Sequence, residues 1–447
     1  MTSPMADDTR GKPTTSKGWF SGLKKVVDRA RPSNIAKLAT LAEALLGVRG
    51  EVSGTALAAE ILAGCERLDA AERLEFLKLL VDRFGADRAR LDRAVERYRA
   101  DPSADNGTAL HAAAEPRRQE LIRRLNLAPG GTAQVVRIRE DLLRLLPEHP
   151  ELAPLDADCV HLLSSWFNRG FLTLRRVDWN TPALILEKII RYEAVHAISS
   201  WDDLRRRIDP ADRLCYAFFH PTLPNDPLIF VEVALTREMP AAILPLLAVD
   251  RRPLDARRAT VAVFYSISNC QTGLRGVPLG NLLIKQVVQE LKLTAPGLKT
   301  FVTLSPVPGF ASWLAQERSA KASSVLPAAE RDVLRALDTP GWHDRPDVAR
   351  TLKPVLSDAI AAYFLQARAP NGRVIDPVAR FHLNNGARLE RVNWLADTSA
   401  RSLEQGLGFM VNYLYDLGDI EKNHEAFADH SEVVASREVR RLLRPRT

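Results

Sequence analysis

The chain changes character along Phe301-Val-Thr-Leu-Ser-Pro-Val-Pro-Gly-Phe-Ala-Ser-Trp-Leu314, where a strand-like pattern passes through a serine and a Pro/Gly turn into a helical pattern. The apolar residues before the serine are typical of a buried strand. Pro306 lacks an N–H group and restricts the preceding residue to extended geometry, so we expect the strand to end at Ser305. Enzymes of the α/β class often place reactive hydroxyls there, but this segment alone favours a serine that only caps the following turn.

Further strands are predicted on both sides of this stretch. Apolar, β-branched or aromatic runs occupy residues 214–220, 227–235, 260–268, 299–304, 389–395 and 408–415. Helical patterns lie between them, at residues 279–293, 331–337 and 348–367. This order predicts an α/β domain with a mixed sheet and helices packed on it.

The first half of the chain has a different pattern. Helical periodicity covers residues 34–46, 69–84, 88–98, 109–127, 133–146 and 156–170, with Asp69 as a predicted N-cap. No period of 20 to 50 residues recurs, which excludes a solenoid. We therefore expect an all-α helical bundle before the α/β domain, and nothing in the bundle looks catalytic.

Composition excludes several classes of protein. The chain has 447 residues and a net charge of +7, which suits an anionic partner but is modest for this length, so we interpret it mainly as solvated surface. No apolar run reaches the ~18 residues that span a membrane. The four cysteines are widely spaced, without a CxxC pair or a Cys/His cluster, which argues against a zinc site and indicates a reducing compartment.

A glycine-rich segment between a predicted strand and a predicted helix runs from Gln271 to Asn281. Gly273, Gly276 and Gly280 would let the backbone turn and approach a ligand closely. N–H groups at the helix start would then face a pyrophosphate, to which Arg275 adds a bidentate donor. A glycine-rich turn without a ligand fits this segment about equally well when it is taken alone.

Five longer blocks resemble malonyl-CoA decarboxylases. They occur in family order at residues 220–235, 264–285, 381–388, 393–399 and 410–416, and the resemblance covers roughly residues 190–420. It implies a catalytic domain of the GNAT acetyltransferase type behind an all-helical N-terminal domain. It also implies malonyl-CoA as substrate and acetyl-CoA as product, with no cofactor, because coenzyme A enters as part of the substrate.

The resemblance assigns roles to individual residues. The histidine of the His-Leu-x-Asn-Gly-Ala block is catalytic in the family, and in this chain it is His382. The residues around it, taken alone, predict that His382 follows a strand and precedes a tight turn. Its partner is the serine of the Ser-Pro-x-Pro-Gly-Phe block, Ser305, and Tyr415 belongs to the active-site region. Some animal members carry a carboxylate where this chain has Pro278, which removes any acid role at that position.

The remaining binding candidates lie in or near the glycine-rich segment. Its similarity to the acyl-CoA pyrophosphate loop of acetyltransferases implies that Gln271, Gly273, Arg275, Gly276 and Gly280 bind substrate. Asn281 would help to hold a carboxylate or a carbonyl group. Glu232 is a candidate buried acid, better interpreted as a strand residue satisfied by hydrogen bonds.

Loss of CO2 from a malonyl thioester passes through an enolate, which needs hydrogen-bond donors and then a proton at the α-carbon. A histidine titrates in the right range, so kcat/KM should depend on a group titrating near neutral pH. The main alternative is a GNAT-type N-acyltransferase, which would use the same loop. A serine hydrolase is disfavoured because no Gly-x-Ser-x-Gly elbow occurs in the sequence. A non-enzymatic scaffold protein is disfavoured because Ser305, His382 and the glycine-rich loop are all intact.

The predicted organisation is a basic tail (residues 1–33), a helical domain (34–191) and a catalytic domain (192–447). We expect a homo-oligomer, dimer or tetramer, assembled through the helical domain. The tail has no secretory core, and its acidic residues argue against a transit peptide. Together with the Arg/Ala-rich composition this predicts a bacterial cytoplasmic protein without nucleic-acid partners or a stable membrane anchor.

Overall fold

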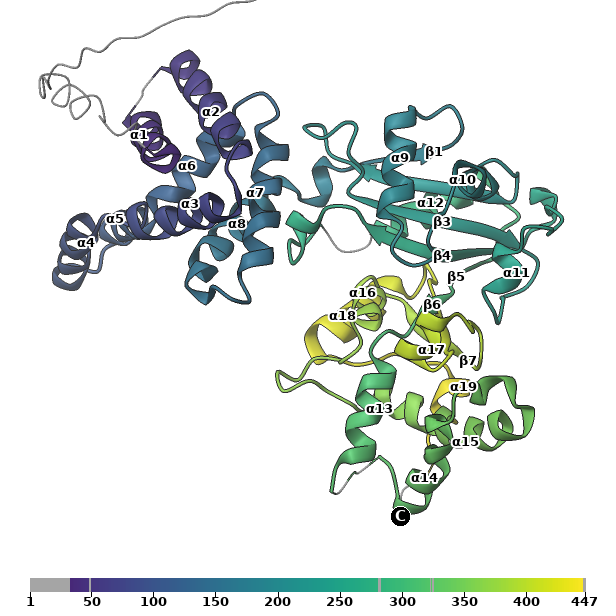
Figure 1. The fold of residues 1–447 in the computed structure, drawn as a ribbon. Coiled ribbons are helices and arrows are strands. Elements are labelled where there is room, and N and C mark those ends of the chain that lie inside the picture. The colour runs from purple at the N-terminus through teal and green to yellow at the C-terminus, as the bar shows by residue number, and fades with distance from the viewer. Residues whose placement is uncertain (1–32, 48–49, 280–282, 322, 324, 445–447) are drawn as a thin grey trace, which may run out of the picture. The chain divides into compact units, whose positions relative to one another are not determined.

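The computed structural model describes residues 33–47, 50–279, 283–321, 323 and 325–444 (Figure 1). The chain divides into two compact units, the first ending at Gly131 and the second beginning at Thr132. Residues 1–32, most of the predicted basic tail, lie outside the described residues. Within the described part of the chain, no helix is long and apolar enough to cross a membrane.

The first unit is helical, as predicted. It contains α1 (Asn34–Gly47), α2 (Glu51–Glu66), α3 (Ala70–Arg83), α4 (Arg88–Ala100), α5 (Ala104–Ala114) and α6 (Arg117–Asn126). Asp69 caps α3 through a capping box with Glu72, so the predicted N-cap is confirmed. The predicted helix at residues 109–127 is two helices instead, because Pro116 cannot continue the first one. The sequence pattern missed α2, whose Ala- and Gly-rich faces differ little in polarity.

The second unit holds α7 (Gly131–Leu145), α8 (Ala153–Trp166) and a mixed eight-stranded sheet. Its strands are β1 (Thr173–Val177), β2 (Arg213–Phe219), β3 (Ile229–Thr236), β4 (Val261–Asn269), β5 (Thr300–Thr303), β6 (Ser305–Pro306), β7 (Arg388–Asn393) and β8 (Met410–Leu414). The order is β1-β2-β3-β4-β5-β8-β6, with β7 paired to β8. Strands β4 and β5 pair in parallel, whereas the other pairs of strands described in the sheet are antiparallel. Helix α12 (Leu283–Thr294) lies between β4 and β5 in the chain.

Helices cover both faces of this sheet (Figure 1). On one face, Ile284, Val288 and other apolar residues of α12 pack against β2 and β3. On the other face, α9 (Ala183–Tyr192) and α10 (Trp201–Ile208) pack against Phe219 and Phe230. Strands β2 and β3 are buried on both faces, which explains their nearly continuous apolar sequences. The predicted α/β domain with a mixed sheet and helices packed on it is thus present.

Two details differ from the sequence prediction. Strand β1 belongs to the sheet although it lies within residues 34–191, the range assigned to the helical domain. It is an edge strand with mostly exposed side chains, so it carries no apolar run to reveal it. The chain also pairs beyond Thr303, because Ser305 and Pro306 form the short strand β6 against β8. The predicted domain boundaries themselves stay predictions.

The last part of the second unit contributes β7, β8 and several helices. Its helices are α13 (Phe310–Ser319), α14 (Ala328–Val333), α15 (Pro346–Leu365), α16 (Pro377–Asn384), α17 (Ala400–Gly406), α18 (Ile420–His430) and α19 (Arg437–Arg440), with the short α11 (Leu244–Leu247) earlier in the chain. Helix α15 is almost entirely buried along its second half. It packs in the same core as α12 and the strands, and so supports the segments that carry the candidate site.

Candidate active site

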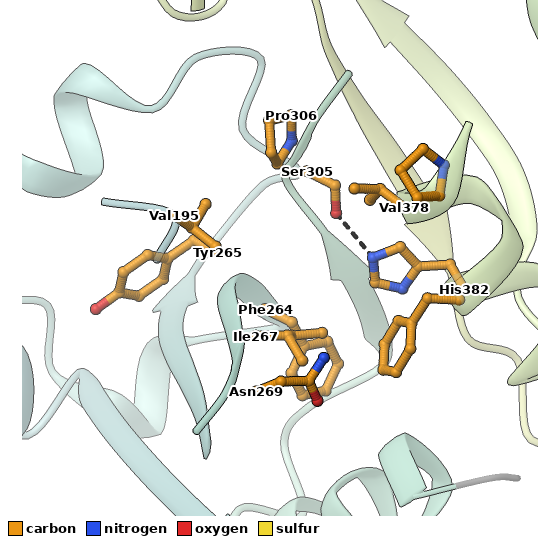
Figure 2. A pocket seen from close by; sticks show the side chains of 11 residues that line it. Val195, Phe264, Tyr265, Ile267, Asn269, Ser305, Pro306, Val378 and His382 are labelled. Carbon is orange, nitrogen blue, oxygen red and sulfur yellow. Dashed lines mark hydrogen bonds between the residues drawn. The ribbon is translucent and has the colours of Figure 1, made fainter. Parts of the chain in front are cut away.

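Three predicted residues that are far apart in the sequence meet in the second unit. The Oγ atom of Ser305 lies 3.0 Å from Nε2 of His382, and the hydroxyl of Tyr415 lies 2.7 Å from Nδ1 of the same ring. Figure 2 shows the Ser305 hydroxyl pointing toward the imidazole. The side chains of Ser305 and His382 are 77 residues apart in the chain, so the fold rather than local sequence forms the pair.

Strand pairing positions the serine and the tyrosine. Ser305 is opposite Val411 of β8, and Tyr415 directly follows β8, with its backbone N–H donating to the carbonyl of Phe301 (2.8 Å). Thr303, two residues before the serine and completely buried, accepts a hydrogen bond from the Ser305 hydroxyl (2.9 Å) and from the backbone N–H of Tyr413 (3.1 Å). The sequence prediction did not include Thr303, although the two-residue spacing in an extended segment places it beside Ser305.

The histidine is positioned by a helix, and the prediction that His382 follows a strand is wrong. It lies in α16, which begins after the N-cap Asp376 with Pro377 in its first turn. The Asp376 carboxylate accepts hydrogen bonds from the N–H of Ala379 (2.7 Å) and the hydroxyl of Tyr363 (3.2 Å). An Asp-Pro pair is a helix-start signal that the sequence interpretation overlooked. Burial raises the pKa of Asp376 to about 6.

Burial controls the charge of the imidazole. Only 2% of His382 is exposed, and desolvation lowers its pKa to about 3, so the ring is neutral at physiological pH. The ring of Tyr413 stacks on it, with centroids 4.5 Å apart. The expectation of a histidine that titrates near neutral pH in the free enzyme is therefore wrong, because burial disfavours the charged form of the ring.

The pair borders a cavity of about 260 Å³. Its wall is largely apolar and is formed by Val195, Phe264, Tyr265, Ile267, Asn269, Ser305, Pro306, Pro377, Val378, Phe381 and His382. A register shift between β3 and β4 falls at Tyr265, so this strand departs from regular pairing where it borders the cavity. The cavity is large enough for a small acyl group and combines apolar walls with one hydroxyl–imidazole pair.

A second cavity of about 480 Å³ is lined by the glycine-rich segment, including Gln271, Arg275 and Gly276. Asn269 and Phe381 line both cavities. Gly276 has a positive φ of 78°, which favours glycine. The predicted binding residues Gly280 and Asn281 lie outside the described residues.

Gly273 has a role that the sequence interpretation did not foresee. It does not line the second cavity; a Cβ atom there would come within 2.0 Å of the carbonyl oxygen of Val136 in α7. The guanidinium of Arg139, also in α7 and 2% exposed, donates to the Gly273 carbonyl (2.6 Å) and to the carboxylate of Asp156 (2.9 Å). Gly273 therefore lets a helix, rather than a ligand, approach the loop.

Other candidate groups are not in the cavity wall. Glu232 is completely buried, and its carboxyl group accepts a hydrogen bond from Arg207 (3.1 Å). Burial, and then the nearby charge of Glu193, raises its pKa to about 8. Burial also raises the pKa of the Cys270 thiol, which fits a packed cysteine. Among the described residues, no group of three or more His, Cys, Asp and Glu side chains could hold a metal ion.

Comparisons with known proteins give consistent results. The sequence models of the malonyl-CoA decarboxylase N-terminal and C-terminal domains match residues 84–167 and 170–447. The mitochondrial malonyl-CoA decarboxylase of the goose Anser anser anser is 35% identical over 402 residues, which cover 83% of this chain and 79% of that protein.

Two crystal structures of bacterial malonyl-CoA decarboxylases are also similar. That from Rhodopseudomonas palustris is 58% identical, with a TM-score of 0.89, and the match covers 91% of this chain and 99% of the other. That from Agrobacterium vitis is 56% identical, with a TM-score of 0.88 and coverages of 92% and 100%. With its sequence and its fold both matched over most of their length, the chain belongs to the malonyl-CoA decarboxylase family of carboxy-lyases.

Proposed function

We propose that this chain converts malonyl-CoA to acetyl-CoA and CO2 at the Ser305–His382 pair, without a metal ion or biotin. The observation that carries the proposal is the adjacency of two cavities. One contains the hydroxyl–imidazole pair, the other is lined by the glycine-rich loop, and Asn269 and Phe381 border both. A CoA thioester with its phosphates at the loop would reach the first cavity with its acyl group.

The apolar wall favours the first step. The carboxylate of the malonyl group loses hydration among Phe264, Ile267 and Val378. The product CO2 is uncharged, so its transfer into the same apolar surroundings costs little hydration energy. The bond between the α-carbon and the carboxylate carbon breaks, and its electron pair moves onto the thioester oxygen as an enolate. Hydrogen-bond donors positioned for that charge lower the barrier more than they stabilise the substrate.

We assign the second step to the Ser305 hydroxyl, which lines the cavity and contacts His382. Ser305 gives its proton to the α-carbon, and the Nε2–H group of neutral His382 stabilises the resulting alkoxide. Ser305 then recovers a proton from solvent, so the overall reaction consumes one proton. Tyr415 holds the imidazole in the required orientation through Nδ1.

The experiment is to incubate the purified chain with malonyl-CoA and EDTA, without biotin, and to follow acetyl-CoA. In D2O, protonation of an enolate would place one solvent deuterium on the methyl group. The alternative, an N-acyltransferase, would release free CoA in the presence of amines, which a thiol reagent detects. No acetyl-CoA, or free CoA as the main product, would contradict the proposal.

A homo-oligomer and a bacterial cytoplasmic location stay predictions. The oligomeric state is measured by light scattering after size-exclusion chromatography of the full-length chain. A monomer at micromolar concentration would contradict the predicted assembly.

A further inference from the structure

A short turn at residues 194–197 is held by side chains rather than by regular secondary structure. The Glu193 carboxylate accepts hydrogen bonds from the N–H groups of Val195 and His196, both at 2.8 Å. The guanidinium of Arg207 donates to the carbonyls of His196 (2.8 Å) and Ala197 (3.1 Å). The peptide groups around Val195 are thus fixed from two sides by charged groups.

Two further contacts fix the start of the turn. The backbone N–H of Ala194 donates to the hydroxyl of Ser268 (3.2 Å), and its carbonyl accepts from Arg401 (2.6 Å). These partners come from β4 and α17, so distant parts of the second unit hold the same turn. Hydrogen bonds to charged groups are the stronger ones in proteins, and the turn has several.

The groups that hold the turn are themselves supported. The Ser266 hydroxyl donates to the Glu193 carboxylate (2.7 Å), and Arg207 is paired with Glu232. Ser266, Arg207 and Glu232 are all buried. A buried, interconnected network keeps its side chains in one arrangement, so the turn should move little.

The turn contributes one side chain to the Ser305–His382 cavity. Val195 lines the cavity, and Figure 2 shows it beside Tyr265, on the side away from His382. The apolar residues Val378 and Phe381 lie on α16 with the histidine. A group bound between the reactive pair and the opposite wall would therefore meet Val195.

We infer that Val195 is a specificity-determining residue, which limits the size of the substituent on the α-carbon of the acyl group. The inference rests on the proposed function, because it takes the acyl group to occupy this cavity. On this inference, the space between Ser305 and Val195 accommodates an unsubstituted malonyl group. An α-methyl group, as in methylmalonyl-CoA, would contact the Val195 side chain, which the fixed turn cannot withdraw.

The test compares kcat/KM for methylmalonyl-CoA and malonyl-CoA in the wild type and in Val195→Ala. Removing two methyl groups from the wall should raise the ratio of the two values by about tenfold or more, since a methyl group in an apolar pocket is worth roughly a factor of 10–200. Val195→Ile should lower the ratio and should also slow the decarboxylation of malonyl-CoA. A ratio within about twofold of wild type in a folded Val195→Ala enzyme would overturn the inference.

Val378→Ala is the matched control, because it shortens another valine of the same cavity on the side of His382. It should change kcat/KM by the same factor for both substrates and so leave the ratio near the wild-type value. An equal rise of the ratio in Val378→Ala would mean that total cavity volume, rather than the Val195 wall, sets selectivity.

A second variant tests the network. Glu193→Gln keeps the size of the side chain but removes the charge that holds the turn. Val195 could then withdraw from the cavity, so this variant, like Val195→Ala, should raise the ratio. A wild-type enzyme inactive toward malonyl-CoA would overturn the proposed function and the inference with it. Activity toward malonyl-CoA with an unchanged ratio in Val195→Ala would overturn the inference alone.

Discussion

The hydroxyl of Tyr415 lies 2.7 Å from Nδ1 of His382, while Ser305 contacts Nε2 of the same ring. Burial raises the pKa of Tyr415, so its hydroxyl keeps its proton. His382 Nδ1 is the partner available to that proton, and we therefore assign the tautomer that carries hydrogen on Nε2. In this tautomer the ring donates to Ser305 and leaves the serine proton free for Thr303 or for a substrate.

Tyr415→Phe should lower kcat about tenfold or more, because the imidazole loses the donor that selects its tautomer. Tyr413→Phe is the matched control. It keeps the stacked ring and removes a buried hydroxyl without a hydrogen-bond partner among the described residues. Thermal unfolding should show a more stable Tyr413→Phe enzyme, since that hydroxyl is costly to bury, and steady-state kinetics should show a much smaller loss of kcat. Equal losses in the two variants would contradict the assigned tautomer.

The pH profile of kcat/KM should not contain His382 between about pH 5 and 8, because its pKa of about 3 keeps it neutral there. Asp376, with a pKa of about 6, does titrate in this range. Its protonation as the pH falls removes the charged N-cap of the helix that carries His382. We expect kcat/KM, corrected for ionisation of the substrate, to decline below about pH 6 in the wild type. Asp376→Asn keeps a capping oxygen and should give a flat profile; an unchanged decline would assign it to another group.

Ser305→Ala should reduce kcat by ~10²-fold or more, because it removes the hydroxyl that we propose protonates the α-carbon. KM should change little, since most of the binding energy comes from the CoA portion of the substrate. Ser312→Ala, at an exposed position in α13, is the control for a general effect of losing a serine. Near-normal turnover by Ser305→Ala in an acetyl-CoA assay would reject the proposed role.

Arg275→Ala should raise KM for malonyl-CoA more than it lowers kcat. The exposed Arg275 lines the loop cavity, where a pyrophosphate would be bound equally in the ground state and the transition state. Free CoA should inhibit the wild type competitively and the variant poorly. The same inhibition constant in both enzymes would argue against phosphate binding at this loop.

Glu232→Gln should stabilise the folded enzyme at alkaline pH. The folded-state pKa of about 8 lies above the value of about 4.3 expected in the unfolded chain. The carboxyl group therefore contributes its full share of stability below about pH 4, and this share is lost as the pH rises toward 8. The difference in Tm between variant and wild type should be near zero at pH 4.5 and about 2–4 °C or more at pH 8.5. Glu187→Gln, at an exposed position, should show no such trend.

The sequence predicted the elements that carry long apolar patterns. The central strands β2 to β5 carry nearly continuous apolar runs. The helices α3 and α12 each have a buried apolar face, so their hydrophobic periodicity is visible in the sequence. Strand β1 and helix α2 were missed because their faces differ little in polarity. Helix α16 was missed because its start depends on Asp376 and Pro377 rather than on periodicity.

The convergence of Ser305, His382 and Tyr415 was predicted from block resemblance, and the structure brings them together. Their roles stay predictions. Val195 could not be recognised in advance, because its position depends on Arg207 and Arg401, which have no spacing relationship with it in the sequence. The pKa of His382 was equally inaccessible, since it depends on the complete burial of the ring in the folded chain.

The hydrogen bond from Arg139 to the carbonyl of Gly273 joins groups 134 residues apart. Closing so long a segment is entropically expensive, and a turn rich in glycine gives little local structure to offset that cost. We therefore expect the loop that lines the second cavity to reach its final conformation when α7 docks against it. Ordering of this loop should be a late, non-local event in folding, and local unfolding of α7 should disorder the loop before the sheet itself opens.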